Sequence, residues 1–580
     1  MVEHGGSPRR SGWPAGLTSV VVTVLALGPL LVRGGTALRG DMVFVPDQPW
    51  KSAWLGLDGS VPRAVPMDAL VALVDDVVPG PVLQRLLLAA AFLLGGFGIA
   101  HLTRRFAPLG QVAAVLVFLW NPWVYARLEI GQWPTVLGYG LLPWLVAAAV
   151  RVRDRRDLGR PWLLLVLVAT AVCAPSVGLL GVAVALGVVC AGRDRRQAAV
   201  VLALGAIANL PWVVPALLGP SIRGNDVGFD AFAARGESPL GTLPSLLSMG
   251  GIWKTSVAAP ERTSVLVIAA AGVFAALLLA GFRYAVPVLG RRTSTALAGL
   301  GAAALLVAFL PSLDPVGSAL DDVSAHIPAL GILRDSQRYL APLGLVLALG
   351  AAGLVDRLVR ERPAGVAGGD PGGRVVGAWL LVVAPVLLLP SMFWGLRGDL
   401  APVHYPAEWS QVAAHLDPDE GSVVVLPWTG SYRGFGWNHD RAVLDPAPRL
   451  LPGEVLIDDR VYLHGVVVPS EDPFLVRVGA ALDSAQPAVG LRRLGVRWVV
   501  VEKDNGVDGA TEAGLGGRVV HDGPWLRVVE LVDGKTVSGF SRHRPPTWPV
   551  SLADAIAASA VVVSIWYVTR RKTRNKPKTM

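Results

Sequence analysis

Charged residues are scarce in this chain of 580 residues, and their scarcity excludes a soluble globular protein. Asp, Glu, Lys and Arg make up 16% of the sequence, whereas about a quarter of an average soluble domain is charged. Hydrophobic residues make up 53%. Uninterrupted apolar runs of about 17–25 residues, the length that crosses a bilayer, recur along the chain. The sequence therefore predicts a polytopic α-helical membrane protein.

Cysteine and catalytic signature motifs are also nearly absent. The two cysteines, Cys173 and Cys190, both lie in predicted spans, which argues against a disulfide and leaves no metal-ligand spacing. Walker-type phosphate loops and the G-x-S-x-G motif of serine hydrolases are missing. The pair His439-Asp440 has no matching nucleophile motif, so hydrolysis is not predicted. The predicted inner loops are too short for an ATPase domain, so energy must come with a substrate or from a gradient.

The formal net charge of +9 does not indicate a nucleic-acid partner. Basic residues stand in short blocks between apolar runs, which is the positive-inside pattern of membrane proteins. With cytoplasmic N- and C-termini, twelve spans place these blocks on the inner side of the plasma membrane. The first outer loop, 34–80, carries three basic and six acidic residues. No clean cleavage site follows the apolar run 17–32, so we expect a retained signal anchor.

The twelve spans include one pair, 161–174 and 175–191, that has two interpretations. It could be a single long helix kinked at Ala174-Pro175, because proline removes a backbone donor. Merging the pair would move every later basic loop to the outer side, which favours two spans. The expected spans are 16–33, 81–101, 109–126, 133–150, 161–174, 175–191, 197–218, 263–282, 293–311, 338–355, 375–395 and 551–568.

The segment 396–550 differs from the rest, with few long apolar runs and many turn residues. Its stretches 421–428, 496–503 and 526–531 are rich in β-branched residues and bounded by Gly, Pro or Asp, which predicts strands. The spacing of 405–416 predicts a helix. A small mixed α/β domain on the outer side follows. The expected organisation is a transmembrane domain over 1–395, the extracytoplasmic α/β domain over 396–550, and a final helix with a basic cytoplasmic tail over 551–580.

Two acids, Asp41 and Asp47, lie in "RGDMVFVPDQPW" (39–50), at the start of the first outer loop. One of them could act as a general base, or both could bind a divalent ion, Mg or Mn, that holds a phosphate-bearing donor. A carboxylate at a low-dielectric boundary suits base chemistry. The alternative is a pair of solvated loop acids beside aromatic membrane anchors.

Three arginines on the outer side are candidates for binding a donor phosphate. Arg127 follows the helix-breaking Asn121-Pro122 and could hold a phosphate bidentately or pair with Glu129. Arg334 and Arg338 are four residues apart, so on a helix they would share one face at the bilayer surface, next to lipid head groups. The acids that could pair with Arg334 and Arg338 instead are Asp335, Asp321 and Asp322.

The stretch "PWTGSYRGFGWNHD" (427–440) interleaves aromatic and polar residues, as in a surface that stacks against sugars. An acceptor glycan would then contact Trp428, Tyr432, Trp437 and Asn438. The alternative is a loop whose aromatic residues pack on the core of the domain.

These features together resemble the GT-C superfamily of membrane glycosyltransferases, and the layout is similar to YfhO-type bacterial membrane proteins and to the N-terminal part of actinobacterial arabinofuranosyltransferases. The stretches "RGDMVFVPDQPW", "NPWVYARLEIGQW" and "LRDSQRYLAPLG" carry the resemblance. It implies a polyprenyl-phosphate sugar donor and an outer C-terminal domain. It places Asp41 as the first-loop catalytic acid with Asp47 second, and Arg334 and Arg338 as donor-phosphate contacts. The abundance of Ala, Gly, Val and Arg with little Lys fits an actinobacterial source.

The leading hypothesis is an inverting glycosyltransferase that builds an envelope glycan on the outer face, with membrane lipid, a lipid-linked sugar and a glycan or lipid acceptor as partners. A transporter or flippase of a lipid-linked glycan is the second hypothesis. It predicts ionisable residues deep in the spans, which the sequence hardly shows. The third is a non-catalytic scaffold for envelope assembly, for which Asp41 would be dispensable.

Overall fold

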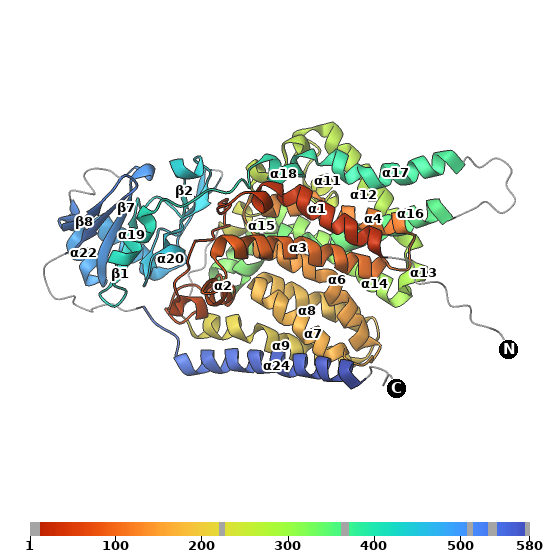
Figure 1. The fold of residues 1–580 in the computed structure, drawn as a ribbon, viewed down its shortest axis with the longest axis horizontal. Helices are drawn as coiled ribbons and strands as arrows, with labels where there is room; N and C mark the ends of the chain where they lie inside the picture. Colours follow the sequence, from red (N-terminus) through yellow and green to blue (C-terminus); the bar gives the residue numbers. More distant parts are fainter. Residues whose placement is uncertain are drawn as a thin grey trace.

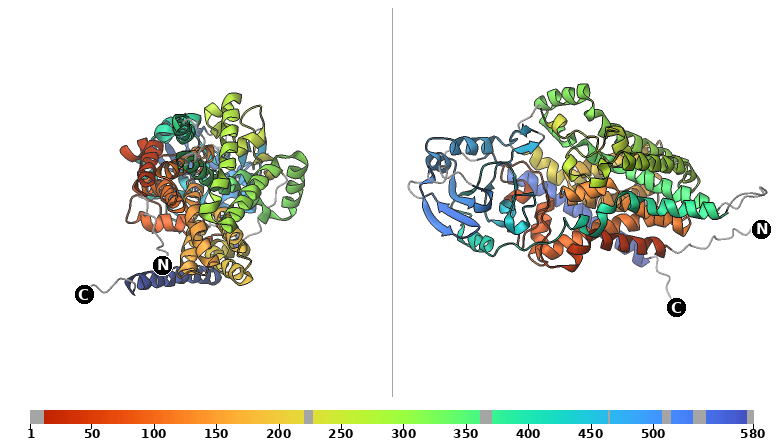
Figure 2. Two further views of the ribbon diagram at one scale, coloured as in Figure 1. Left: turned by 90° about the vertical axis from the view of Figure 1, so that its right-hand side faces the viewer. Right: turned by 90° about the horizontal axis from the view of Figure 1, so that it is seen from above.

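The computed structural model describes residues 12–219, 227–360, 371–463, 465–506, 514–531 and 542–574. These residues form two parts that follow one another along the long axis of the molecule, a bundle of long helices and a smaller part built on a β-sheet (Figure 1). The right-hand view of Figure 2 shows the same division from above.

Long apolar helices make up the larger part. Within the described residues, nine helices are long and apolar enough to cross a bilayer, and a tenth span results if the bent pair 372–388 and 390–397 is one span. Two shorter apolar helices complete the set, so each of the twelve predicted spans coincides with a helix. The chain is a multi-pass membrane protein. Its bundle helices are α1 (Trp13–Val32), α3 (Gly80–Thr103), α4 (Pro108–Leu119), α5 (Pro122–Glu129), α6 (Trp133–Arg153), α7 (Gly159–Cys173), α8 (Pro175–Cys190), α9 (Arg195–Leu218), α12 (Val265–Gly281), α14 (Arg291–Phe309), α16 (Ala341–Arg360), α17 (Pro371–Leu388), α18 (Phe393–Arg397) and α24 (Thr547–Arg574).

The two short helices, α7 and α8, form an antiparallel hairpin. Ala174 between them is extended, with φ −170° and ψ 153°, and turns the chain back. A Cβ on Gly178 would lie 2.9 Å from Ala171, and one on Gly181 would lie 2.7 Å from Thr170, so the two helices pack face to face. The single kinked helix is therefore wrong for this pair. At about 1.5 Å per residue, each helix is shorter than the roughly 30 Å core of a bilayer.

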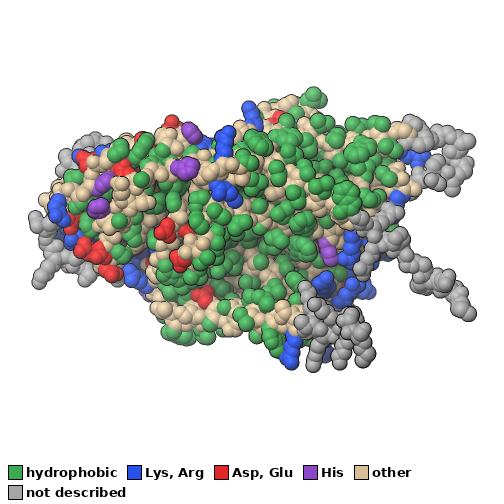
Figure 3. All heavy atoms as spheres, in the orientation of Figure 1, with side chains coloured by type: hydrophobic (Ala, Val, Ile, Leu, Met, Phe, Trp, Pro, Cys, Tyr) green, Lys and Arg blue, Asp and Glu red, His purple; other side chains and the backbone are tan. Residues whose placement is uncertain are grey.

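The surface of the bundle matches a membrane environment. In Figure 3, hydrophobic side chains cover the middle of the molecule, acidic side chains lie mostly toward the sheet domain, and Lys and Arg gather at the opposite end of the bundle. The first turn of α1 and the last turn of α24 also lie at that opposite end (Figure 1). This distribution agrees with the positive-inside pattern of the sequence.

The predicted break at Asn121-Pro122 is confirmed. The Asn121 side chain accepts a hydrogen bond from the Val124 backbone N–H at 3.1 Å and caps α5, and Pro122 occupies its first turn. The Asn121 amide also donates to the Phe118 carbonyl at 2.7 Å, which satisfies a free carbonyl at the end of α4. Asn121 therefore closes the end of α4 and caps the short α5, which carries Arg127.

The smaller part is an α/β domain with a five-stranded sheet in the order β4-β1-β7-β9-β8. The strands β4, β1 and β7 run parallel, and β9 and β8 are antiparallel to their neighbours. The three predicted strands are present as β1, β7 and β9, and the predicted helix as α19. The elements are α19 (Glu408–His415), β1 (Ser422–Leu426), β2 (Tyr432–Arg433), β3 (Val443–Leu444), α20 (Ala447–Leu450), β4 (Val455–Leu456), β5 (Val461–Leu463), β6 (Val466–Val468), α21 (Pro473–Leu482), α22 (Pro487–Arg493), β7 (Val496–Glu502), β8 (Arg518–Asp522) and β9 (Leu526–Glu530).

The first outer loop is part of the core of this domain. Leu38, Val43 and Val45 are buried in one hydrophobic cluster with Val403 and Trp409. Main-chain bridges join Thr36 to Val403 and Gly40 to Val443. The apolar residues of the loop explain this arrangement, because they could not stay exposed at the bilayer surface without a partner. The loop also contains α2 (Met67–Asp75), and further short outer helices are α10 (Gly228–Ala231), α11 (Thr242–Leu247) and α15 (Asp314–His326).

Candidate active site at the outer end of the bundle

Asp41 is anchored where the first outer loop touches the turn between α5 and α6. Its backbone N–H donates to the Ile130 carbonyl at 2.8 Å. Two glycines allow this contact. A Cβ on Gly40 would lie 2.1 Å from the Ile130 oxygen, and one on Gly131 would lie 2.1 Å from the Arg39 oxygen. Both glycines have positive φ, at +53° and +83°, so the sequence places at these two positions the residue that tolerates such backbone.

The carboxylate of Asp41 is held by side chains from two other segments. Gln132 donates from Nε2 to Oδ2 at 3.3 Å, and the Tyr432 hydroxyl donates to Oδ1. Burial raises the pKa of Tyr432 well above its ordinary value, and the charge of Asp41 adds to that rise. The phenol therefore stays protonated and remains a hydrogen-bond donor. Since β3 pairs with Gly40, the β2–β3 hairpin holds both the main chain and the side chain at this point.

A buried ion pair lies next to this carboxylate. The guanidinium of Arg127, which is completely buried, forms a fork on Asp335 with Nη1 at 2.5 Å from Oδ2 and Nη2 at 2.9 Å from Oδ1. Its Nη1 also donates to Gln132 Oε1 at 2.7 Å, so one glutamine amide joins Arg127 to Asp41. The alternative in which Arg127 pairs with Glu129 is not what forms, because Glu129 pairs with Arg39 and Arg127 with Asp335.

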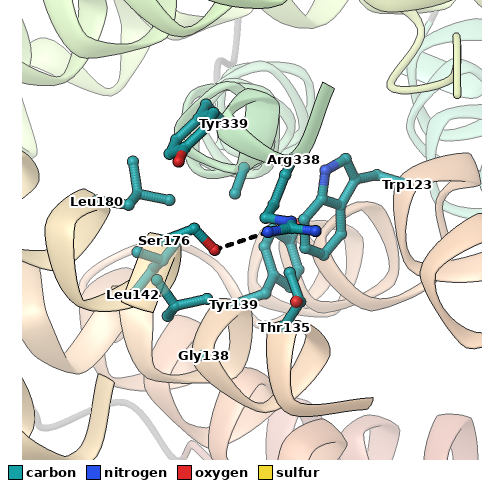
Figure 4. Close-up of a pocket in the computed structure, with 11 residues that line it drawn as sticks. Trp123, Thr135, Gly138, Tyr139, Leu142, Ser176, Leu180, Arg338 and Tyr339 are labelled. Atoms are coloured by element: carbon teal, nitrogen blue, oxygen red, sulfur yellow. Dashed lines mark hydrogen bonds between the residues drawn. The ribbon is translucent and has the colours of Figure 1, made fainter. Parts of the chain in front are cut away.

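Arg338 shares Asp335 with Arg127 and points into a small pocket. It donates to Asp335 Oδ2 at 3.2 Å and to Ser176 Oγ at 2.9 Å. Burial raises the pKa of Asp335, but the two guanidinium groups outweigh that effect and hold the pKa at about 2. Figure 4 shows Arg338 and Ser176 facing each other beside the apolar side chains of Leu142 and Leu180. The cavity of about 10 Å³ has room for about one water molecule.

Arg334 does not share a face with Arg338, so the expected helical spacing is wrong. The chain forms 3-10 turns over Pro328–Leu333 and Ser336–Leu340, and α16 begins only at Ala341. Arg334 therefore turns toward the α/β domain, where it pairs with Glu471 and lies 4.9 Å from the centre of the Phe232 ring. Glu471 also accepts a bond from Arg63 at 3.0 Å. Arg334 thus joins the bundle to the α/β domain.

Asp47 lies apart from these groups. It is exposed, and its charge acts on Asp75 in α2. In the part of the chain that the structure describes, Asp47 shares no hydrogen-bond partner with Asp41, and no group of three His, Cys, Asp or Glu side chains comes together as a metal site would require. Asp41 and Asp47 therefore do not form one shared metal site in the described structure.

The four residues expected to bind an acceptor are divided among different surroundings. Trp428 packs on the hydrophobic cluster of one sheet face, and Trp437 packs on that of the other face, where it stacks with Phe435 at 5.0 Å. Asn438 is fully buried and donates to the Arg441 carbonyl at 3.1 Å. Of the four, Tyr432 alone reaches Asp41 in the described structure.

One residue at this site has no signal in the sequence. Lys254 lies in the loop after α11, and its Nζ is 5.6 Å from the centre of the Tyr432 ring. Lys254 belongs to no motif. The chain has only seven lysines among its many arginines, so the rarity of lysine was the one feature of the sequence that could have drawn attention to this position. Gln132 stands close to Arg127 in the sequence, but its hydrogen bond to Asp41 arises only from the fold.

Comparison with known proteins places the fold. No family model and no curated protein sequence matches the chain. The cryo-EM structure of the arabinofuranosyltransferase AftD from Mycobacteria matches at a TM-score of 0.57 with 17% identity, over 93% of this chain and 41% of that one. A mutant of that protein matches at 0.56 with 18% identity, over 92% and 42%. ArnT from Cupriavidus metallidurans in the apo state gives 0.43 with 14% identity, over 90% and 98%.

The chain thus spans about two fifths of the length of the mycobacterial protein. At these identities the likeness concerns the arrangement of helices and sheet rather than individual residues. The resemblance noted in the sequence is confirmed at the level of architecture: the chain shares its fold with the matched part of the mycobacterial arabinofuranosyltransferase AftD.

Proposed function

We propose that the chain is a membrane glycosyltransferase. It transfers a sugar from a polyprenyl-phosphate donor to an acceptor hydroxyl of an envelope glycan or lipid, on the outer face of the plasma membrane, with both termini in the cytoplasm. The single observation that carries this proposal is the Asp41 carboxylate, held by Gln132 and Tyr432 at the end of the bundle where the α/β domain lies. The fold shared with an arabinofuranosyltransferase supports the reaction class.

Asp41 acts as the general base in this proposal. It takes the proton of the acceptor hydroxyl while that oxygen attacks the anomeric carbon of the donor sugar. The bond from the anomeric carbon to the phosphate oxygen breaks, and its electron pair leaves with the lipid phosphate. Attack from the face opposite the phosphate inverts the anomeric configuration. Gln132 and Tyr432 fix the direction of the carboxylate, so that no reorientation is needed during the reaction.

The donor phosphate lies on the side of Arg338 in this proposal. The Arg338 guanidinium lines the pocket between α6, α8 and α16, at the same end of the bundle as Asp41. Arg127 acts through Asp335 as a positioning residue, since it is fully buried and forms a fork on that carboxylate. Arg334 fixes the α/β domain over the site through Glu471. On the acceptor side, the proposal keeps Tyr432 at the reacting centre.

Asp41→Asn tests the proposal, with Asp47→Asn as the matched control in the same loop. Each variant is expressed in a strain deleted for the gene, its amount in the membrane is measured, and envelope glycans are profiled by linkage analysis. We expect Asp41→Asn to reproduce the glycan defect of the deletion and Asp47→Asn to restore the wild-type profile, because Asp47 is exposed and apart from the site. Loss of a general base costs about a hundred- to ten-thousandfold in rate.

Restoration of the profile by Asp41→Asn would show that Asp41 is not a base. The scaffold and flippase hypotheses would then account for the deletion phenotype.

A further inference from the structure

Lys254 is fixed at the site by its neighbours in the chain. Ile252 and Trp253 are both buried, in one hydrophobic cluster with Ala126 and Ile130. Ile130 is the residue whose carbonyl binds the Asp41 backbone. The backbone that carries Lys254 is therefore packed against the same turn that positions Asp41. This packing limits the positions that the lysine ammonium can occupy.

The ammonium of Lys254 stands close to the proposed reacting groups. It lies 5.6 Å from the centre of the Tyr432 ring, the ring whose hydroxyl binds Asp41. Burial lowers the pKa of Lys254, and the negative charge of Asp41 opposes that effect. Lys254 is thus half-buried and within electrostatic reach of Asp41.

Four of the other cations around this site have carboxylate partners, and Arg441 donates to three backbone carbonyls. Arg39 pairs with Glu129, Arg127 and Arg338 pair with Asp335, and Arg334 pairs with Glu471. Across the residues that the structure describes, no hydrogen bond and no ion pair joins Lys254 Nζ to a protein group. A partly buried ammonium without a partner is costly, which is the condition under which a site gains by binding an anion.

We propose that Lys254 binds the phosphate ester of the donor and, together with Arg338, forms the anion subsite of the reaction centre. This inference rests on the proposed function and goes further by assigning the phosphate contact to a residue with no carboxylate partner. A lysine suits this role, because its ammonium is a compact charge that accepts any phosphate orientation. When the bond from the anomeric carbon to the phosphate oxygen breaks, the diester becomes a monoester with one more negative charge. The Lys254 ammonium would stabilise that added charge.

Binding of a polyprenyl monophosphate tests the inference independently of catalysis. The full-length protein is placed in nanodiscs of zwitterionic lipid, and the affinity for fluorescent decaprenyl phosphate is measured for the wild type, Lys254→Met and Lys254→Arg. Methionine keeps the apolar stem of the side chain and removes the charge. Lys503→Met is the matched control, because Lys503 already pairs with Asp522 at 2.6 Å.

We expect Lys254→Met to weaken binding about tenfold or more, since a charge-assisted hydrogen bond is lost. Lys254→Arg should bind within about threefold of the wild type, and Lys503→Met should bind as the wild type does. Equal affinity of Lys254→Met and the wild type, with both folded, would overturn the proposal.

Competition and a catalytic variant complete the experiment. Displacement of the probe by inorganic phosphate in the wild type identifies the phosphate group alone as the ligand. No displacement by inorganic phosphate identifies the lipid-linked phosphate as the ligand.

Asp41→Asn should keep the binding of the probe. A Lys254-dependent affinity in a protein that performs no glycosyl transfer would keep this inference and reject the proposed function. Transfer that is lost in Asp41→Asn, with binding indifferent to Lys254, would reject this inference alone.

Discussion

Tyr432 is the residue through which the α/β domain contributes to the site. Its hydroxyl donates to Asp41, and its raised pKa keeps it a donor over the whole physiological pH range. A neutral phenol that donates to a carboxylate oxygen fixes the direction of that group without adding charge. In the proposed mechanism, Tyr432 therefore orients Asp41 for proton transfer from the acceptor hydroxyl rather than touching the sugar.

Replacing Tyr432 by Phe removes only this donor. We expect the transfer rate to fall about ten- to hundredfold, which is the range for a lost hydrogen bond to a charged group, with little change in donor affinity. Initial rates and decaprenyl phosphate binding, measured on the same preparation, check this. Tyr462→Phe is the control, because Tyr462 is an exposed tyrosine of the same domain. Equal rates for the two variants would show that the Tyr432 hydroxyl has no part in the reaction.

The sequence could predict which residues carry the chemistry only where a local pattern marks them. Asp41 follows the first apolar run, and Arg127 follows a helix break, so both stood out. Their partners did not, because the Arg127–Asp335 pair is separated by 208 residues and the Asp41–Tyr432 pair by 391. A local sequence pattern cannot reveal contacts between residues that lie so far apart in the chain. Lys254 is recognised only by its position beside Tyr432 in the structure.

At the scale of elements, the site depends on how closely the first outer loop approaches the α5–α6 turn. The backbone at Gly131 has φ +83°, and a Cβ there would lie 2.1 Å from the Arg39 oxygen and 2.3 Å from the Met42 nitrogen. Real Cβ atoms do not come so near backbone atoms, so any side chain at this position must push the loop away. The loop carries Asp41, and the contact between the loop and the α5–α6 turn thus fixes the position of the proposed base.

Gly131→Ala should therefore impair both stability and activity. We expect about 2 kcal/mol or more of destabilisation from the strained backbone and the displaced loop, together with a large loss of transfer. Thermal unfolding in detergent and a transfer assay measure the two effects. Gly272→Ala serves as the control, because a Cβ on this α12 glycine meets open space. Its stability should stay near that of the wild type, and a matching loss in both variants would contradict the steric argument.

Elements with a strong regular pattern were predictable, and those shaped by context were not. Apolar length predicted a helix at each of the twelve places, of which nine or ten are long enough to span a bilayer in the described structure, and the β-branched runs predicted three strands of the sheet. The segment before α16 was expected to be helical. Pro328 instead opens a 3-10 stretch that ends at Leu333, and a second one covers Ser336–Leu340. The tertiary bonds of Asp335 and Gln337 hold these turns and override local propensity.

At the scale of the whole molecule, the α/β domain and the first outer loop are joined by polar as well as apolar contacts. Lys51 of the loop is buried against α20, where its Nζ donates to the Pro448 carbonyl at 2.7 Å. Burial lowers its pKa to about 7. The joint between the two parts therefore contains a lysine that loses its charge near neutral pH.

The stability of this joint should rise with pH. Between about pH 7 and pH 10.5 the unfolded lysine holds a proton that the folded one has released, so unfolding takes up a proton and becomes less favourable as pH rises. The gain is about 2 kcal/mol between pH 7 and pH 9. Thermal unfolding at pH 7, 8 and 9 measures it, with Lys51→Met as the comparison. Parallel pH profiles for the two proteins would refute the assignment to Lys51.

The hydrogen bond between Tyr432 and Asp41 also has a consequence for biogenesis. Asp41 leaves the ribosome long before Tyr432 and β3, because Tyr432 lies 391 positions further along the chain, which takes about 20–80 s to synthesise at roughly 5–20 residues per second. During that interval the early helices are already inserted, but the β2–β3 hairpin that holds the carboxylate does not yet exist. Under the proposed mechanism, a nascent or truncated chain would therefore sit in the membrane without reacting. Activity would begin only when the α/β domain has been translocated and folded. The order of synthesis would therefore prevent an incomplete chain from consuming lipid-linked sugar.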